Sequence, residues 1–180
     1  MIKCKKATPQ DAYGIVGYFN AMSPTTKRYY APHDFDVDTV ISICQGNYKK
    51  YQAFIGIEDD LVIAYAVIKN GLKDGEVNRF AAYAVRLSSG QDYSLAPSVA
   101  DAFQSQGIGG LLLNSVESHL KELGAEKIIL WGGVQLRNQK AVQYYLKNGF
   151  QTLGKFWHDG IENLDMVKYL NNAPTNQKTN

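Results

Sequence analysis

The chain has 180 residues, enough for one domain with a sizeable core and too few for two comfortable ones. Its apolar fraction of 45% and charged fraction of 20% are those of an ordinary globular protein. The formal net charge of +2 is close to neutral and gives no support to a nucleic-acid-binding surface, so we expect no nucleic acid partner.

Other features of the composition narrow the class of protein further. No apolar run approaches the length of a membrane span, and the N-terminus lacks a signal peptide's apolar region, so we expect a cytoplasmic protein without membrane contact. The two cysteines, Cys4 and Cys44, fall in separate expected elements, which favours reduced thiols. His33, His119 and His158 lack the spacing of metal ligands, so we expect no metal site.

The N-terminal part of the chain predicts a strand followed by helices. Residues 2–7 read as a short strand, after which Thr8 is a good N-cap and Pro9 suits a first helical position. Apolar residues then recur with helical spacing as far as Met22, and Ser23-Pro24 ends that helix.

The next segments alternate between connections and regular elements. Residues 25–35 read as a polar and aromatic connection, and residues 37–48 carry a second helical stripe. The β-rich runs 51–58 and 61–69, separated by Asp59-Asp60, predict a hairpin. After a turn cluster, the run 77–87 fits a strand or a helix equally well.

Residues 93–100 predict a central strand, and this strand contains Pro97. A proline cannot donate a hydrogen bond to a neighbouring strand, so it is expected where the strand lacks a partner. A strand with one open side fits this residue, and an ordinary edge strand or bulge fits it as well.

A glycine-rich turn, Gln104 to Gly110, follows that strand and precedes a helical stripe that runs from Ile108 to Leu123. The first turn of a helix presents backbone N–H groups without intrahelical partners, and glycines there allow phosphate oxygens to approach closely. The physical interpretation is a pyrophosphate cradle, with a turn that binds nothing as the alternative. No Gly-Lys-Ser/Thr follows and the spacing is not GxGxxG, which disfavours nucleoside triphosphates and dinucleotides.

The C-terminal part contains a second constellation of residues. Gly124 closes the long helix, and residues 127–131 predict a buried strand. A helix over 139–147 would put Asn138, Ala141 and Tyr145 on roughly one face, before a strand over 150–156. We expect the polar tail 171–180 to be disordered.

These two segments resemble the signatures of the GNAT N-acetyltransferase superfamily. Residues Gln104 to Gly109 match Gln-x-x-Gly-x-Gly, and residues 138–150 match Asn-x-x-Ala-x-x-x-Tyr-x-x-x-Gly-Phe at every named position. The resemblance covers residues 1–170 as one acyltransferase domain. It is weakest over 71–92, which looks like an insertion of the kind that carries specificity when it lies beside a site.

The resemblance implies an α/β (α+β) fold with a mixed, mostly antiparallel central sheet flanked by helices. Its fourth and fifth strands, 93–100 and 127–131, should be parallel neighbours that splay apart, so that the pantetheine arm of acetyl-CoA fills the gap. Acetyl-CoA is then the co-substrate, and transfer to a small-molecule or peptide amine acceptor proceeds directly in a ternary complex. A homodimer is compatible with this fold.

The resemblance also assigns site residues. Tyr145 is the expected general acid for the leaving thiolate, since a phenol has a pKa near 10, and a core aromatic is the alternative. We expect the adjacent Tyr144 to face elsewhere. The residues expected to bind the cofactor are Val99, Ala100, Asp101, Gln104, Ser105, Gln106, Gly107, Ile108, Gly109, Gly110 and Asn138. The region of Tyr29, Tyr30 and His33 often shapes the acceptor site in relatives, and a packed loop is the other interpretation.

The general base is left open by the sequence. Many relatives place a glutamate on the fourth strand where this chain has Ser94 and Leu95. A water chain could serve instead, and the nominated side chains are Glu76, Asp92, Asp101 and His158. The missing glutamate favours an alternative function, a non-catalytic domain that binds or senses acyl-CoA. A structural module that binds no nucleotide is a third interpretation, which both motifs disfavour.

Overall fold

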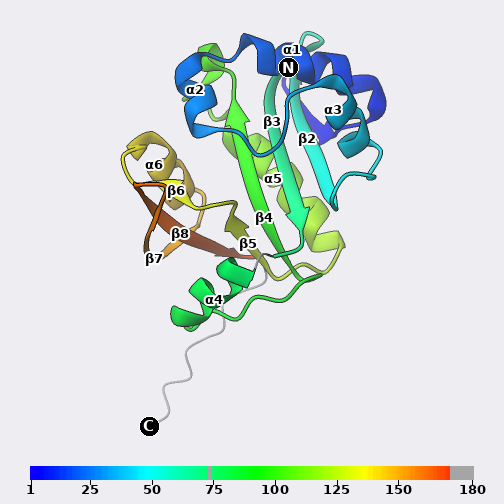
Figure 1. Cartoon of the computed structure of the whole chain (residues 1–180). Coiled ribbons are helices and arrows are strands. Elements are labelled where there is room, and N and C mark those ends of the chain that lie inside the picture. Colours follow the sequence, from blue (N-terminus) through cyan, green and yellow to red (C-terminus); the bar gives the residue numbers. More distant parts are fainter. Residues whose placement is uncertain (73, 171–180) are drawn as a thin grey trace.

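The computed structural model describes residues 1–72 and 74–170 of the chain (Figure 1). Its strands are β1 (Lys3–Lys6), β2 (Tyr51–Glu58), β3 (Leu61–Asn70), β4 (Asp92–Val99), β5 (Lys127–Leu130), β6 (Val134–Gln135), β7 (Gln151–His158) and β8 (Ile161–Tyr169). Its α-helices are α1 (Ala12–Ala21), α2 (Pro24–Tyr29), α3 (Val37–Cys44), α4 (Asp74–Ala82), α5 (Ile108–Glu122) and α6 (Gln139–Lys147). The tail 171–180, for which we expect disorder, lies outside the described residues.

The strands form one mixed sheet in the order β1-β2-β3-β4-β5-β8-β6, with β7 paired to β8. Within the described chain β4 and β5 run parallel, while the other strand pairs are antiparallel. Parallel neighbours need a crossover connection, and α5 supplies it. The predicted α/β fold with a mostly antiparallel sheet and parallel fourth and fifth strands is therefore confirmed.

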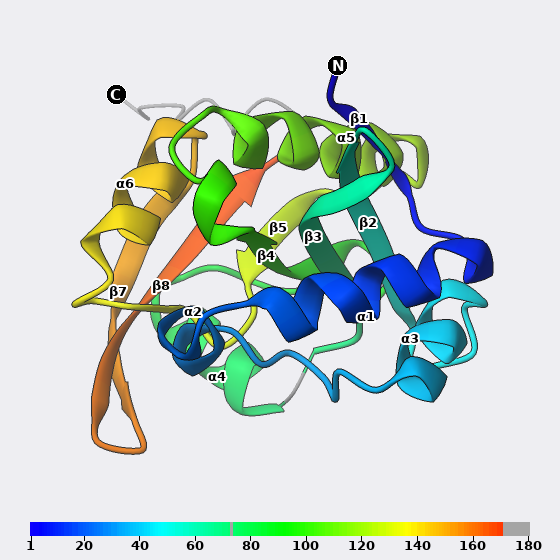
Figure 2. The same cartoon turned by 90° about the horizontal axis from the view of Figure 1, so that it is seen from above.

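Helices cover both faces of the sheet (Figure 2). Alternate residues of β3 point to opposite faces, so Ala64 and Ala66 pack with α5 while Tyr65 packs with α1 and α3. The helical stripe of α5 buries Ile108, Leu112, Leu113, Val116 and Leu120. This two-sided burial explains why β3 reads as a nearly continuous apolar run.

The segment after Met22 differs from the expected connection. Pro24 is the first residue of a short helix, α2, because the Ser23 side chain accepts a hydrogen bond from the Thr26 amide at 3.2 Å. Pro24 suits this position, since its missing N–H would have no intrahelical partner there. The Ser-Pro pair thus ends α1 and begins α2.

The insertion between β3 and β4 contains α4, which resolves the ambiguous run 77–87 in favour of a helix followed by a loop. Phe80, Val85 and Leu87 bury against β5 and β8. Arg79 forms a two-bond ion pair with Asp165 on β8, whose side chain is fully buried. The insertion is therefore packed as part of the core.

Candidate active site

The site begins where β4 and β5 separate. Their parallel pairing runs from Asp92 with Lys127 to Leu95 with Leu130, and the last contact is from the Trp131 amide to the Leu95 carbonyl at 3.0 Å. The strand β4 continues to Val99, and Figure 1 shows it running past β5 toward α2. Strands 4 and 5 therefore splay, as predicted.

The direction in which the backbone groups of β4 point explains why a proline is tolerated at position 97. Alternate residues of a strand direct their N–H and C=O groups to the same side, so Pro97 and Val99 face the gap as Leu95 does. A proline costs nothing on this side because no strand lies there to accept a hydrogen bond. The amide of Ala100 instead faces β3 and donates to the carbonyl of Ile63 at 2.8 Å.

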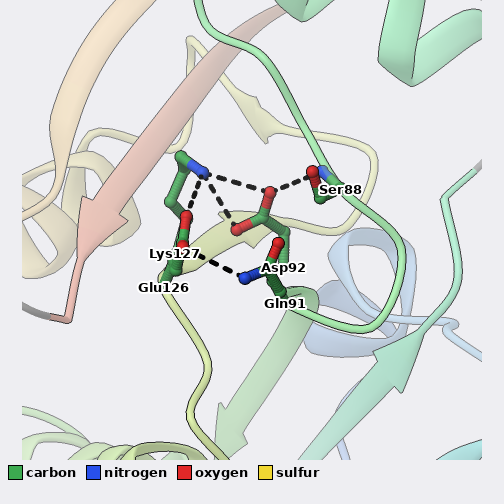
Figure 3. Close-up of polar contacts among 5 residues, drawn as sticks. All are labelled: Ser88, Gln91, Asp92, Glu126 and Lys127. Carbon is green, nitrogen blue, oxygen red and sulfur yellow. Dashed lines mark hydrogen bonds and ion pairs between the residues drawn. The ribbon is translucent and has the colours of Figure 1, made fainter.

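The opposite end of the two strands is held together by a buried ion pair. Figure 3 shows the Asp92 carboxylate accepting hydrogen bonds from the Ser88 amide, at 2.7 Å, and from the Lys127 ammonium, at 3.2 and 3.3 Å. The Gln91 side chain also donates to Glu126 at 3.1 Å. These contacts hold β4 and β5 together at the end where they pair. The place where the two strands separate is therefore fixed as well.

The open end of the gap leads into a pocket of about 1130 Å³. One half is lined by the glycine-rich turn, the start of α5 and α6. The other half is lined by α2, the end of β4, residues 131–135 and the β7–β8 hairpin. No described residue of the insertion 71–92 lines it, so the suggested role of this segment in specificity has no support from its position.

The glycine-rich turn presents free backbone donors to the pocket. Gly107 is the N-cap of α5 and has a left-handed φ of 83°, and Ser105 has a φ of 64°. A Cβ atom on Gly107 would meet no heavy atom within 4 Å, so this glycine borders open space. Within the described chain, the backbone N–H groups from Ser105 to Gly109 donate to no acceptor. Such converging donors at a helix N-terminus favour an anion.

Gln104 connects this turn to its surroundings. Its side-chain nitrogen donates to the Val99 carbonyl at 3.2 Å and to Asp101 at 3.1 Å. Its oxygen accepts from the Lys140 ammonium on α6 at 2.7 Å. Lys140, which sequence reasoning did not single out, brings a positive charge to the part of the pocket beside the glycine-rich turn. Its place two residues after Asn138, in the first turn of α6, is the sequence signal that could have identified it.

The second motif forms α6 and its cap. The Asn138 side-chain oxygen Oδ1 accepts from the Ala141 amide at 3.2 Å, and its side-chain N–H groups have no acceptor in the described chain. Tyr145, farther along α6, packs with its ring centroid 5.2 Å from that of Phe150 and has an exposed fraction of 8%. Burial raises the pKa of Tyr145 well above its usual value, and Tyr144 adds to that rise.

Tyr144 does not face elsewhere, and that expectation is wrong. Its hydroxyl donates to the Gly109 carbonyl at 2.9 Å, and the residue lines the pocket together with Tyr145. A Cβ atom on Gly109 would lie 2.9 Å from the Tyr144 ring, so a glycine is required for α5 and α6 to approach.

The predicted site residues divide into two groups. Those that line the pocket are Val99, Asp101, Gln104, Ser105, Gly107, Gly109, Gly110, Asn138 and Tyr145. Those that do not are Ala100, Gln106 and Ile108. Ile108 is buried in the core, and the Gln106 side chain turns back to the Ala102 carbonyl, so these two could reach a ligand only through their amides.

Only some of the residues nominated for acceptor binding and for the general base line the pocket. Tyr29 and Tyr30 line the pocket, whereas His33 packs beneath it, where its Nε2 accepts from the Tyr65 hydroxyl at 2.8 Å. Among the nominated bases, Asp101 and His158 line the pocket. Glu76 and Asp92 do not, because both are buried elsewhere.

No helix in residues 1–72 and 74–170 is long and apolar enough to cross a membrane. Over the same residues, no cluster of His, Cys, Asp and Glu side chains could hold a metal ion.

Comparisons with solved structures show the fold. The GNAT domain of S. lividans PAT matches with a TM-score of 0.72 at 17% identity, over 93% of this chain and 90% of that one. The Salmonella typhimurium protein yncA, solved with its cofactor acetyl-CoA, matches with a TM-score of 0.70 at 16% identity, over 99% of each chain. The ribosomal-protein-alanine N-acetyltransferase of Brucella melitensis gives 0.70 at 17% identity, over 93% and 99%.

Comparisons of sequence identify the family. A search of curated proteins found no match. The profile of the acetyltransferase (GNAT) family, however, matches residues 19–150, which include the splayed strands, the glycine-rich turn and α6. The chain therefore belongs to the GNAT family of acetyltransferases.

Proposed function

We propose that this protein transfers the acetyl group of acetyl-CoA to the amine of a small-molecule or peptide acceptor, directly in a ternary complex. One observation carries the proposal: the gap between β4 and β5 opens into the same pocket as the partnerless amides of the glycine-rich turn and the side chain of Tyr145. Family membership and the acetyl-CoA bound to yncA support the choice of cofactor.

The glycine-rich turn, the end of β4 and the start of α6 together suit the parts of acetyl-CoA. The free amides from Ser105 to Gly109, within the turn that runs from Gln104 to Gly110, would hold the pyrophosphate, with Lys140 adding a countercharge. The backbone around Val99 and Asp101, with Ala100 between them, would pair with the pantetheine arm. The free side-chain N–H groups of Asn138 would donate to that arm from the other side. Holding the thioester in this way converts a bimolecular collision into an oriented encounter.

The reaction needs a bond exchange and three proton transfers. The neutral acceptor nitrogen attacks the thioester carbonyl carbon, the carbon–sulfur bond breaks, the departing thiolate takes a proton, and the nitrogen loses its second proton as the amide forms. Tyr145 would supply the proton that the thiolate takes and would recover the one that the nitrogen loses, directly or through water. Burial raises the pKa of Tyr145 and so keeps the phenol protonated at neutral pH, and desolvation in the same pocket would also make the departing thiolate more basic.

The acceptor ammonium must lose a proton before it attacks. Of the nominated bases, Asp101 and His158 line the pocket, but the Asp101 carboxylate is already occupied by hydrogen bonds from α2 and Gln104. His158 or a water molecule at the pocket mouth is left for this role.

The alternative function is a domain that binds acyl-CoA without turnover, which the absence of the usual glutamate at Ser94 favours. A thermal-shift titration and a thiol-release assay separate the two. The enzyme should be stabilised by acetyl-CoA and release CoA in the presence of an amine, because a ligand bound only by the native state raises the melting temperature. A sensing domain should show the stabilisation alone.

A further inference from the structure

The Asp101 side chain lies between the two halves of the pocket. On one side its carboxylate accepts hydrogen bonds from the Ser23 amide, at 3.1 Å, and from the Thr26 hydroxyl. On the other side it accepts from the Gln104 side chain at 3.1 Å. Asp101 therefore joins the N-terminal end of α2 to the residue that opens the glycine-rich turn.

The helix α2 lines the part of the pocket that lies away from the glycine-rich turn, where the proposed function puts the acceptor. Thr25, Thr26, Tyr29 and Tyr30 all line the pocket. At its C-terminal end, the Tyr30 hydroxyl donates to the Ala96 carbonyl on β4 at 3.1 Å. The helix is thus attached to the β4 segment at both ends, by Tyr30 at one and by Asp101 at the other.

The contact between α2 and Asp101 is not part of the core. Residues 24–29 of α2 contain no buried side chain, so hydrophobic packing anchors the helix only at its flanks, through Met22 and Tyr30. Hydrogen bonds to a charged carboxylate are among the stronger ones in proteins. The hydrogen bond from Thr26 lowers the pKa of Asp101, so the carboxylate stays charged at neutral pH.

We propose that Asp101 is a positioning residue that docks α2 as a wall of the acceptor site, so that acceptor affinity depends on its carboxylate. This inference rests on the proposed function. Its side chain acts separately from its backbone, which would pair with the pantetheine. Substitution of the side chain should therefore weaken acceptor binding and leave acetyl-CoA binding nearly unchanged.

The first test measures the position of α2 without any acceptor. In Asp101→Asn, a single uncharged acceptor oxygen replaces the two oxygens of the carboxylate, so the hydrogen bonds with α2 are weakened. We expect hydrogen exchange of the amides in residues 26–30 to become about tenfold faster, in line with the loss of a hydrogen bond to a charged group. Asp36→Asn is the matched control, because Asp36 caps α3 at 2.9 Å in the same way and no residue of α3 lines the pocket.

The second test separates acceptor from cofactor. With phenethylamine and trialanine as acceptor probes, Asp101→Asn should raise the acceptor KM about tenfold and change the acetyl-CoA KM by less than about twofold. Thr26→Val, which removes the hydroxyl donor and leaves Gln104 untouched, should act in the same direction. Asp36→Asn should change neither KM.

The outcomes of the two tests distinguish a wrong role for Asp101 from a wrong proposed function. If acetyl-CoA KM rises while acceptor KM and α2 exchange stay at wild-type values, Asp101 belongs to the cofactor cradle and the proposal is wrong. If wild-type protein acetylates neither probe, the exchange experiment alone decides: unchanged exchange in Asp101→Asn overturns the docking role. Absence of turnover with faster exchange would instead count against the proposed function and retain the role of Asp101 in holding α2.

Discussion

Tyr144 donates its hydroxyl to the carbonyl oxygen of Gly109 at 2.9 Å, and this contact joins the two signature segments of the family. Gly109 lies in the first turn of α5, where the pyrophosphate is proposed to bind, and Tyr144 precedes the proposed general acid on α6. The glycine-rich turn and α6 are therefore positioned against each other before any ligand arrives.

Tyr144→Phe should weaken acetyl-CoA binding and leave the chemical step nearly unchanged. The substitution removes one hydrogen bond that holds the turn, worth about 1 kcal/mol, so we expect acetyl-CoA KM to rise about fivefold. Steady-state kinetics at saturating acceptor measures this. A variant with wild-type KM would show that the turn keeps its position without Tyr144.

Gly107→Asn should abolish the stabilisation of the protein by acetyl-CoA. Asparagine tolerates the left-handed φ of 83° better than a branched residue does, and its side chain would project into open space at the cradle. Gly107→Val is a poorer test, because valine is strained at this φ and would destabilise the apoprotein as well. A thermal-shift titration of Gly107→Asn that matches the wild type would show that the phosphates bind elsewhere.

Tyr145→Phe should reduce kcat at least about tenfold with acetyl-CoA affinity nearly unchanged, because general acid catalysis typically contributes ~10²–10⁴-fold and water substitutes in part. The ring and its packing against Phe150 are kept. Tyr13→Phe is a suitable control, since Tyr13 is 77% exposed on α1 and does not line the pocket. Equal turnover of Tyr145→Phe and the wild type, with chemistry rate-limiting, would reduce Tyr145 to a packing residue.

Arg79→Met should destabilise the fold by about 3 kcal/mol, because it leaves the buried Asp165 carboxylate without its partner. The shift in melting temperature caused by acetyl-CoA should persist, since the described part of the insertion does not line the pocket. Lys155→Met is the control, because it breaks the more exposed pair with Glu162 and should cost less than about 1 kcal/mol. Chemical denaturation of the three proteins gives these values, and loss of the acetyl-CoA shift in Arg79→Met would mean that the insertion supports the site.

Local sequence patterns predicted the strand and the helix that we propose bind the cofactor. The apolar spacing of α5, the glycine at its N-cap and Pro97 on the open side of β4 are each dictated by backbone geometry within a few residues. The parallel neighbours β4 and β5 followed from the helix that connects them and from the family resemblance. These features depend little on the rest of the fold, which is why they could be read in advance.

Two kinds of feature were not predicted: the second strand of a hairpin, and contacts between residues far apart in the chain. The β7–β8 hairpin was missed beyond its first strand, although Asp159-Gly160, with φ values of 49° and 73°, is a strong turn signal between them. The contacts of Asp101 with Ser23 and of Arg79 with Asp165 join residues far apart in the chain. No single-sequence pattern predicts such pairs, because they depend on how the elements pack.

The most direct test of the account measures CoA release and acceptor mass together. Purified protein is incubated with acetyl-CoA and a panel of primary amines that includes free N-terminal peptides, and each reaction is followed by a thiol assay and mass spectrometry. The account predicts release of CoA that depends on an amine, with a product heavier by one acetyl group, and a large loss of both in Tyr145→Phe. Stabilisation by acetyl-CoA without acetylation of any amine, or release of CoA that is indifferent to amine and to Tyr145, would contradict it.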